Sequence, residues 1–319
     1  MPTKKIALEE HCNLSVFADN MAAVQDLFAP DFLADVESRL QDFDQLRLEA
    51  MDAGGIELAV LSQTSPGVQL LADREAAVAA AKACNNLMAQ SMAAHPSRFR
   101  GFACVALQDP ESAATELQRC VTELGFVGAL VNGHTQGRYL DQPEFEPFWR
   151  MLEQLDVPLY LHPAGPYQLP HVLTGLPVLD GAVWSWTGET ASHALRLVFG
   201  GVFERHPKAK LILGHMGETL PFELWRLDSR AAILPSNRRP PRPPSAVLRE
   251  HLWITTSGVC ADGPLLCALQ ELGEERVMFS VDYPYEDSNL ACHWIETAAL
   301  SEPTRRKVCR ENAAALLRL

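Results

Sequence analysis

Short apolar runs, each bounded by polar or turn-forming residues, recur along the whole chain. None shows the strict apolar–polar alternation of a strand with one face in water, so we interpret them as strands buried on both faces. The expected strands cover residues 5–11, 57–62, 102–107, 127–131, 158–162, 211–215, 252–256 and 277–282.

The segments between these runs carry the end signals of helices. Asp109 is the expected N-cap of one helix, with Pro110 in its first turn, and Asp44 is the expected N-cap of another, which Gly54 and Gly55 end. The expected helices cover residues 44–53, 73–94, 110–124, 144–155, 189–205, 221–233, 289–299 and 302–317.

Eight buried strands alternating with helices predict an α/β fold, a (β/α)8 TIM barrel that forms a single domain over residues 1–319. A doubly wound open sheet is the alternative, but it needs a phosphate-binding glycine loop after the first strand, which the sequence lacks. Residues 12–43 are long for a connection and predict an inserted lid after strand 1. The Pro/Arg-rich residues 235–244 predict an exposed connection, with a polyproline docking motif as the lesser possibility.

Composition limits the possible partners and compartment. The 319 residues are 47% hydrophobic, enough for a large core, and the formal net charge is -13, which argues against nucleic acid and acidic membrane surfaces. No signal peptide or membrane-spanning run is recognisable. The eight cysteines show no C-x-x-C spacing and are expected to be buried thiols, so we predict a soluble, cytoplasmic protein.

Residues that bind metals or transfer protons stand at the ends of the expected strands. In a TIM barrel these carboxyl ends meet at one rim, where active sites lie. Glu9 and His11 are two residues apart, so they point the same way and can share one metal ion. The set is Glu9 and His11 after strand 1, Asn132 after strand 4, His162 after strand 5, His215 after strand 6 and Asp282 after strand 8.

Several of these residues have a structural alternative. Glu9 and His11 could be a charged strand end that faces water. His162 is favoured as a metal ligand, although it could simply end a strand before Pro163. His215 is favoured as an acid/base or substrate contact oriented by Glu218, although the pair could only brace a helix N-terminus. Glu10 should face the surrounding helices and be structural.

Several motifs together resemble the metal-dependent aromatic acid decarboxylases of the amidohydrolase superfamily, most of all those acting on γ-resorcylate (2,6-dihydroxybenzoate) and 2,3-dihydroxybenzoate. The superfamily's hydrolases usually begin with His-x-His, and here Glu9-Glu10-His11 replaces that motif. The resemblance runs in order from residue 5 to the C-terminus and rests on Leu8-Glu9-Glu10-His11, residues 128–133, Tyr160-Leu161-His162-Pro163, Glu189-Thr190, residues 213–218, residues 225–228 and residues 279–282.

The resemblance implies one divalent metal ion, zinc or manganese, held by Glu9, His11, His162 and Asp282. It implies substrate-handling roles for Asn132, His215 and Glu218. It also implies a homodimer or homotetramer, in which Arg226 reaches a neighbouring subunit's site. The alternative for Arg226 is an ordinary salt bridge with Asp228.

The expected activity is the non-oxidative decarboxylation of an ortho-hydroxylated benzoate by a carbon–carbon lyase. Asp282 is the candidate general acid that protonates the ring carbon, and His215 with Glu218 replenishes its proton. Aromatic groups that stack on the ring and exclude water are expected to include Phe17, Trp184 and Trp186. The alternatives are a metal-dependent hydrolase of a lactone or amide, and an inactive metal-binding scaffold.

Overall fold

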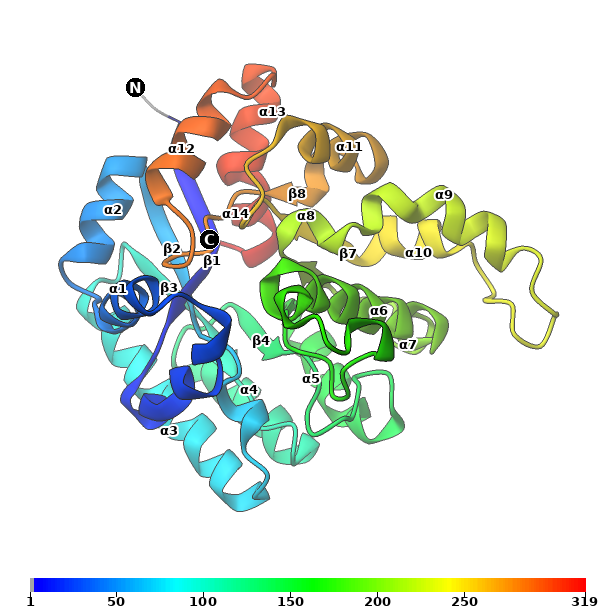
Figure 1. Cartoon of the computed structure of the whole chain (residues 1–319), viewed down its shortest axis with the longest axis horizontal. Coiled ribbons are helices and arrows are strands. Elements are labelled where there is room, and N and C mark those ends of the chain that lie inside the picture. Colours follow the sequence, from blue (N-terminus) through cyan, green and yellow to red (C-terminus); the bar gives the residue numbers. More distant parts are fainter. Residues whose placement is uncertain (1–2) are drawn as a thin grey trace.

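Each strand of the sheet pairs in parallel with the next strand in the chain. The computed structural model describes residues 3–319, and its strands lie in the order β1 to β8, each beside the next in the sequence, as expected for a TIM barrel. The predicted (β/α)8 fold in a single domain is therefore confirmed (Figure 1). The strands are β1 (Lys5–Cys12), β2 (Ile56–Gln63), β3 (Phe99–Cys104), β4 (Gly128–Asn132), β5 (Leu159–His162), β6 (Leu211–Leu213), β7 (Leu252–Thr255) and β8 (Val277–Met278).

The barrel closes where the last strand meets the first. This seam has no regular ladder: one bridge joins Glu10 to Tyr283, and the amide of His11 donates to the carbonyl of Tyr283 at 2.7 Å. The Ser280 hydroxyl accepts from the amides of Leu8 (3.1 Å) and Glu9 (2.6 Å). A side chain thus supplies part of the pairing that backbone groups supply elsewhere.

Helices surround the sheet, most of them where the sequence predicts them. Asp73 and Asp109 cap α3 and α4, with side chains that accept from the amides of Ala76 and Ser112. The helices are α1 (Pro30–Gln41), α2 (Leu46–Gly54), α3 (Arg74–Ala94), α4 (Pro110–Glu123), α5 (Glu146–Leu155), α6 (Ser185–Phe199), α7 (Val202–Arg205), α8 (His215–Glu218), α9 (Leu220–Ala231), α10 (Pro244–His251), α11 (Asp262–Leu272), α12 (Ser288–Thr297), α13 (Glu302–Arg306) and α14 (Asn312–Leu317).

Helices α1, α8, α10 and α11 were not predicted from the sequence, and two further local predictions are wrong. Asp44 is not the N-cap of α2; it pairs with His95 at 2.7 Å, and Asp42 instead accepts from the amides of Gln45 and Arg47. The third strand covers Phe99–Cys104 rather than residues 102–107. Arg100 made its first half look like a loop, but the guanidinium folds back onto the carbonyls of Pro96 and Phe99 while the backbone pairs with β2.

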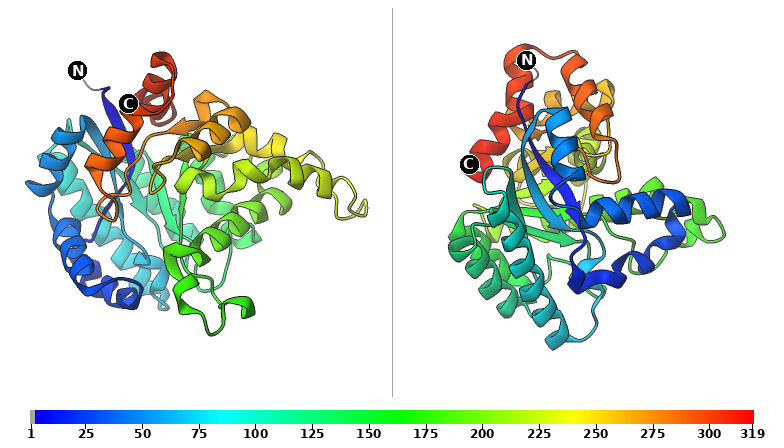
Figure 2. Two further views of the ribbon diagram at one scale, coloured as in Figure 1. Left: turned by 45° about the horizontal axis from the view of Figure 1, so that its top comes forward. Right: turned by 90° about the vertical axis from the view of Figure 1, so that its left-hand side faces the viewer.

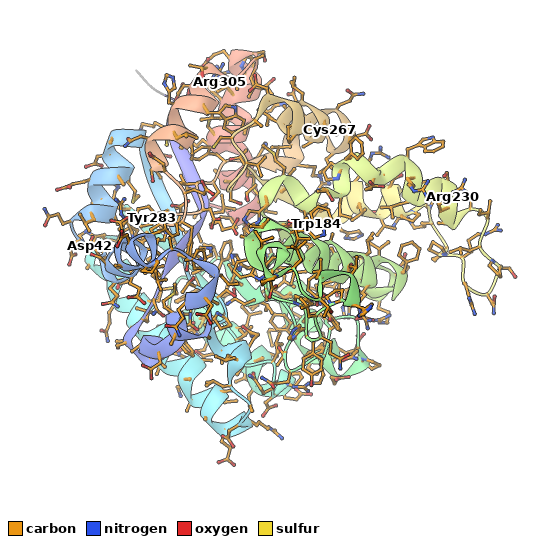
Figure 3. All side chains as sticks on the ribbon, in the orientation of Figure 1. Asp42, Trp184, Arg230, Cys267, Tyr283 and Arg305 are labelled. Carbon is orange, nitrogen blue, oxygen red and sulfur yellow. The ribbon has the colours of Figure 1, made fainter. Side chains whose placement is uncertain are left out.

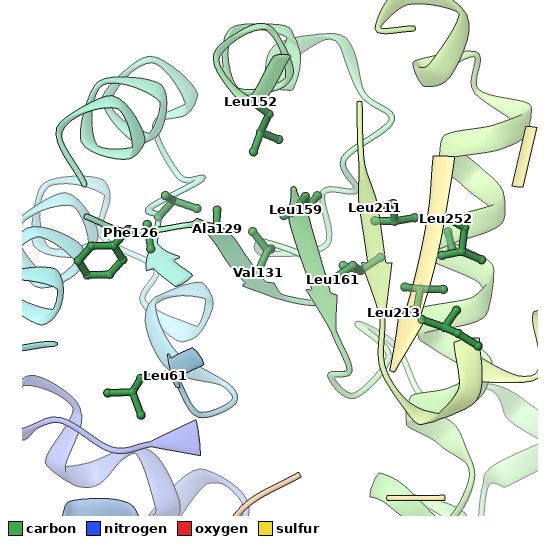
Figure 4. Packing of buried hydrophobic residues seen from close by; sticks show 14 of the residues in the cluster. Leu61, Phe126, Ala129, Val131, Leu152, Leu159, Leu161, Leu211, Leu213 and Leu252 are labelled. Atoms are coloured by element: carbon green, nitrogen blue, oxygen red, sulfur yellow. The ribbon is translucent and has the colours of Figure 1, made fainter. Parts of the chain in front are cut away.

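Leu, Val, Ala and Phe side chains on the outer face of the barrel pack against the helices. Figure 4 shows part of this layer, including Leu61, Val131 and Leu161. The interior is filled by a second cluster, which contains Ile6, Leu8, Val60, Phe102, Tyr160, Ile212 and Met278 and is extended by Leu316 and Leu317 of α14. The cluster leaves the C-terminal ends of the strands free for polar groups.

Two long segments project from the same end of the barrel (Figure 2, right). The first follows β1 and holds η1 (Ser15–Ala23), η2 (Gln25–Leu27) and α1. The second follows β5 and holds η5 (His171–Leu173), η6 (Pro177–Leu179) and η7 (Gly181–Val183). The connection at residues 235–243 is largely exposed, as predicted. Within residues 3–319, no helix combines the length and the apolar character that crossing a membrane requires.

Candidate metal centre and active site

Four side chains from three strand ends converge at the mouth of the barrel. Glu9, His11, His162 and Asp282 each offer one ligand atom, and these atoms lie within 4.8 Å of one another. His162 Nε2 is 3.2 Å from Glu9 Oε1, and His11 Nε2 is 3.3 Å from Asp282 Oδ1. The structure therefore brings together all four residues predicted as metal ligands.

A β-bulge in β1 aims two of these residues. Ala7 pairs with Ala59 and Glu10 with Leu61, so β1 holds one more residue than β2 between those pairs. Ile6 and Leu8 belong to the interior cluster, and the extra residue shifts the alternation so that Glu9 and His11 also face the barrel mouth. Glu10 accepts from Ser280 and from the amide of Val281 instead, which supports the structural role predicted for it.

The arrangement of lone pairs fits a divalent cation. Glu9 Oε1 and His11 Nε2 are buried and have no hydrogen-bond partner in the described part of the chain. The Nδ1 atom of His162 lies 2.9 Å from the carbonyl of Pro163, so it carries the proton and leaves Nε2 with a free lone pair. His11 Nδ1 is likewise paired, with the Ser62 hydroxyl at 3.0 Å. Two imidazoles and two carboxylates aimed at one point are a donor set suited to zinc or manganese.

Charges in the site support one another. Burial raises the pKa of Glu9, but the positive charge of His215 and contacts with His162 outweigh it and bring the pKa to about 2. Burial also raises the pKa of Asp282, but close contacts with the His11 and His215 rings outweigh this effect and lower the pKa below its usual range. Burial lowers the pKa of His11, whereas the carboxylates of Glu9 and Glu218 raise the pKa of His215 well above its usual value. These shifts favour a protonated His215 between the ionised carboxylates of Glu9 and Asp282.

His215 lies between two carboxylates. Its Nδ1 is 2.8 Å from Glu218 Oε1 and its Nε2 is 3.3 Å from Asp282 Oδ2. The turn that holds it is left-handed, with φ of 49° at His215, 54° at Met216 and 52° at Glu218. Such backbone strain in non-glycine residues concentrates at functional sites. The predicted orientation of His215 by Glu218 is what the structure shows.

A cleft of about 210 Å³ opens beside these groups. Its apolar lining comes largely from the segments after β1 and β5, and its polar lining includes hydroxyls, two imidazoles and two carboxylates. Tyr285 stacks on Phe28 with the ring centroids 5.9 Å apart, and its hydroxyl pairs with Thr64 at 2.7 Å. The lining residues are Val24, Phe28, Phe32, Thr64, Ser65, His162, Ala182, Trp186, His215, Asp282, Tyr285 and Glu286.

The three aromatic residues predicted to contact substrate differ in position. Trp186 borders the cleft. Phe17 is buried in the main core cluster, and Trp184 is 53% exposed on the segment before α6 (Figure 3), so neither borders the cleft. Phe28 and Phe32 line the cleft instead, with ring centroids 5.7 Å apart; Phe28 has an extended backbone before α1, so no regular spacing in the sequence indicated its position.

The two other predicted substrate residues lie away from the cleft. Asn132 is buried, with Nδ2 3.5 Å from the carbonyl of Gln63 and Oδ1 unpartnered among the described residues. Arg226 is exposed on α9 and makes no ion pair within residues 3–319. The salt bridge to Asp228 considered as its alternative is absent there, because Asp228 accepts from the amide and hydroxyl of Ser245.

Sequence reasoning missed the polar residues behind the ligands. Tyr160, Thr255 and Ser257 surround one oxygen of Glu9, and Glu286 lines the cleft next to Asp282. Burial and the charge of Asp282 raise the pKa of Glu286. The signal for Thr255 and Ser257 was their alternation at the end of strand 7, the same pattern as in Glu9 and His11.

The chain is similar to known proteins over almost its whole length. The amidohydrolase family model matches residues 11–319. The γ-resorcylate decarboxylase of Rhodococcus jostii (strain RHA1) is 44% identical over 331 residues, which cover 99% of this chain and 98% of the relative. A 2,6-dihydroxybenzoate decarboxylase in complex with 2,6-dihydroxybenzoate superposes with a TM-score of 0.94 at 41% identity, covering 99% and 100% of the two chains. A dihydroxybenzoic acid decarboxylase of Polaromonas sp. JS666, with bound manganese and the inhibitor 2-nitroresorcinol, superposes with a TM-score of 0.94 at 41% identity, covering 99% and 97%.

Proposed function

The chain belongs to the amidohydrolase family, and from this premise we propose that it catalyses the metal-dependent, non-oxidative decarboxylation of an ortho-hydroxylated benzoate. It is a carboxy-lyase that acts on aromatic acids. The observation that carries the proposal is the meeting of Glu9, His11, His162 and Asp282 beside a protonatable His215, at the base of a cleft with an aromatic wall.

The chemistry explains why these groups are needed together. Direct loss of CO₂ from a benzoate leaves an aryl anion, so the ring carbon that bears the carboxylate must be protonated first. A divalent cation bound by the four ligands would hold the carboxylate and keep the ortho hydroxyl ionised. The apolar wall of Phe28, Phe32 and Trp186 excludes water from the ring and leaves its face open towards Asp282.

The protein's own residues supply the proton. The contacts of Asp282 with His11 and His215 lower its pKa and favour the carboxylate, so in this mechanism Asp282 receives a proton before it acts as an acid. His215, held as a cation by Glu9 and Glu218, has its Nε2 3.3 Å from Asp282 Oδ2 and is the source. The proton moves from Nε2 to the carboxylate and from the carboxylate to the ring carbon. The carbon–carbon bond then breaks, its electron pair restores the aromatic ring, and CO₂ leaves.

Three finer points are part of the proposal. We expect a substrate of the 2,6-dihydroxybenzoate type rather than the 2,3 isomer, and Mn²⁺ rather than Zn²⁺, because relatives with 41–44% identity carry those names and manganese. We expect a homodimer or homotetramer, because Phe222 and Trp225 are each 79% exposed on α9 beside Arg226. We also expect a cytoplasmic enzyme, because all eight cysteines are free thiols.

The test is incubation of the Mn²⁺-loaded enzyme with 2,6- and 2,3-dihydroxybenzoate in D₂O. We expect CO₂ release and one deuterium at the vacated ring carbon, with the 2,6 isomer consumed faster. Hydrolysis of a lactone panel without CO₂ release from either benzoate would contradict the proposal and favour a hydrolase. The absence of turnover with Mn²⁺ and with Zn²⁺ would favour an inactive scaffold.

A further inference from the structure

The two oxygens of the Glu9 carboxylate have opposite surroundings. Oε2 accepts hydrogen bonds from the hydroxyls of Tyr160 and Ser257, and the Thr255 hydroxyl lies 3.5 Å away. Oε1 has no hydrogen bond in the described part of the chain and faces His162 Nε2 at 3.2 Å. The carboxylate is 0% exposed, so water does not equalise the two oxygens.

The three hydroxyls form one connected network, which we call the hydroxyl cage. Thr255 Oγ1 is 2.8 Å from the Tyr160 hydroxyl and 2.9 Å from Ser257 Oγ. The hydroxyls of Tyr160 and Ser257 can therefore both donate to Glu9, while the Thr255 hydroxyl donates to one of those two hydroxyls. Every donor in this pattern has an acceptor, and Oε2 is left without room for another partner.

Both strands of the cage place these side chains by alternation. Tyr160 is two residues before His162 on β5, so both face the barrel interior, and Thr255 and Ser257 stand in the same relation at the end of β7. The end of β7 therefore contributes no metal ligand, but it supplies two of the three hydroxyls that surround Glu9 Oε2.

Ser257 also connects the ligand to the proton donor. Its Oγ accepts from the amide of His215 at 3.1 Å while it donates to Glu9. A Cβ atom at Gly214 would lie 2.5 Å from Glu9 Oε2 and 3.0 Å from Ser257 Oγ. Position 214 must thus be glycine for the carboxylate and the cage to fit against the strand end.

We propose that Tyr160, Thr255 and Ser257 are positioning residues that make Glu9 a one-oxygen metal ligand through Oε1. The inference rests on the proposed metal-dependent function. Hydrogen bonds to Oε2 fix the rotation of the carboxyl group about the Cγ–Cδ bond. They also keep Oε2 from competing with Oε1 for the cation. Outer partners of metal ligands typically set metal affinity by about 10- to 100-fold.

The test measures metal affinity directly. Apoenzyme is titrated with Mn²⁺ and the free ion is quantified by electron paramagnetic resonance, for wild type, Tyr160→Phe, Ser257→Ala and the double variant. We expect the dissociation constant to rise about tenfold in each single variant and about 100-fold in the double variant. At saturating Mn²⁺, kcat of Tyr160→Phe should stay within about threefold of wild type, because Tyr160 contacts neither His215 nor the reacting atoms.

Matched variants separate positioning from simple loss of packing. Thr255→Ser keeps the hydroxyl and should keep wild-type affinity, whereas Thr255→Val keeps the shape and should bind more weakly. Thr190→Val removes a buried hydroxyl that bonds only within its own helix, to the Trp186 carbonyl, and should leave affinity unchanged.

The outcomes distinguish this inference from the proposed function. If wild type binds one Mn²⁺ and the double variant binds it within about twofold as tightly, the hydroxyl cage has no positioning role. An equal loss of affinity in Thr190→Val would equally overturn the inference. If wild type itself binds no Mn²⁺, both the inference and the metal-dependent function fail.

Discussion

Replacing Asp282 with asparagine separates metal binding from proton delivery. The substitution keeps the size of the side chain and removes the anion that lies 3.3 Å from both His11 Nε2 and His215 Nε2. Glu9, His11 and His162 remain, with Glu9 Oε1 and His11 Nε2 still lacking other partners in residues 3–319. We expect the variant to bind Mn²⁺, more weakly than wild type, and to lose turnover.

The expected loss of turnover in Asp282→Asn follows from the role of Asp282 as the general acid. An amide cannot pass a proton from His215 to the ring carbon, and a positioned general acid contributes about 10²- to 10⁴-fold. The expected fall in kcat at saturating Mn²⁺ is therefore about 10²- to 10⁴-fold, or about 2.7 to 5.4 kcal/mol in the barrier.

The assay is CO₂ release from 2,6-dihydroxybenzoate, measured beside Mn²⁺ titration of the same preparation. Asp44→Asn, at an exposed aspartate paired with His95, is the control and should retain wild-type kcat. A rate for Asp282→Asn within tenfold of wild type at saturating metal would refute the assignment of Asp282 as the acid.

Three further predictions follow from the same geometry. Glu218→Gln removes the anion 2.8 Å from His215 Nδ1 and should lower kcat about 10- to 100-fold with little change in KM. Steady-state kinetics measures both constants, and a fall in KM alone would contradict the prediction. Removal of the metal by a chelator should abolish turnover, and Mn²⁺ at 100 times its dissociation constant should restore it. The same Mn²⁺ concentration should raise the free energy of unfolding, measured by calorimetry, by about 2.7 kcal/mol. Full activity of the chelated protein would contradict the proposed chemistry. Burial lowers the pKa of His193 to about 3 from 6.5, so the folded protein keeps this ring neutral and loses stability as pH falls below 6.5 towards 3. Between pH 7.5 and 5.5 the free energy of unfolding in urea should fall by about 1.4 kcal/mol from this residue. The fall should vanish in His193→Gln, whose amide oxygen can still accept from the amide of Leu140. Equal pH dependence in both proteins would show that His193 is not its source.

The rim of the barrel was predictable because every strand leaves its last side chains at the same end. Once Leu8-Glu9-Glu10-His11 and Tyr160-Leu161-His162 are read as buried strands, parallel order brings their ends to one rim. The β-bulge in β1 then turns Glu9 and His11 towards His162. No helical spacing or loop conformation enters that argument, which is why it survives errors such as the three-residue offset of β3.

The walls of the cleft were not predictable in the same way. Phe17 and Phe28 lie in one irregular segment, and only its path over the barrel decides that Phe28 reaches the cleft while Phe17 enters the core. Helix α11 was missed because its apolar residues follow Gly258 and Pro264, which look like a loop. Tyr160 looks like any aromatic core residue until its hydroxyl is placed beside Glu9.

The seam between β8 and β1 brings groups from near the two ends of the polypeptide to one candidate metal site. Glu9 and His11 lie on one side of that seam and Asp282 on the other, 271 residues further along the chain than His11. An ion held by all three would be a cross-link that closes almost the entire sequence into one loop, the kind of constraint that most reduces the freedom of an unfolded chain. Binding of such an ion would then reinforce the closure of the barrel and complete the active site in one event.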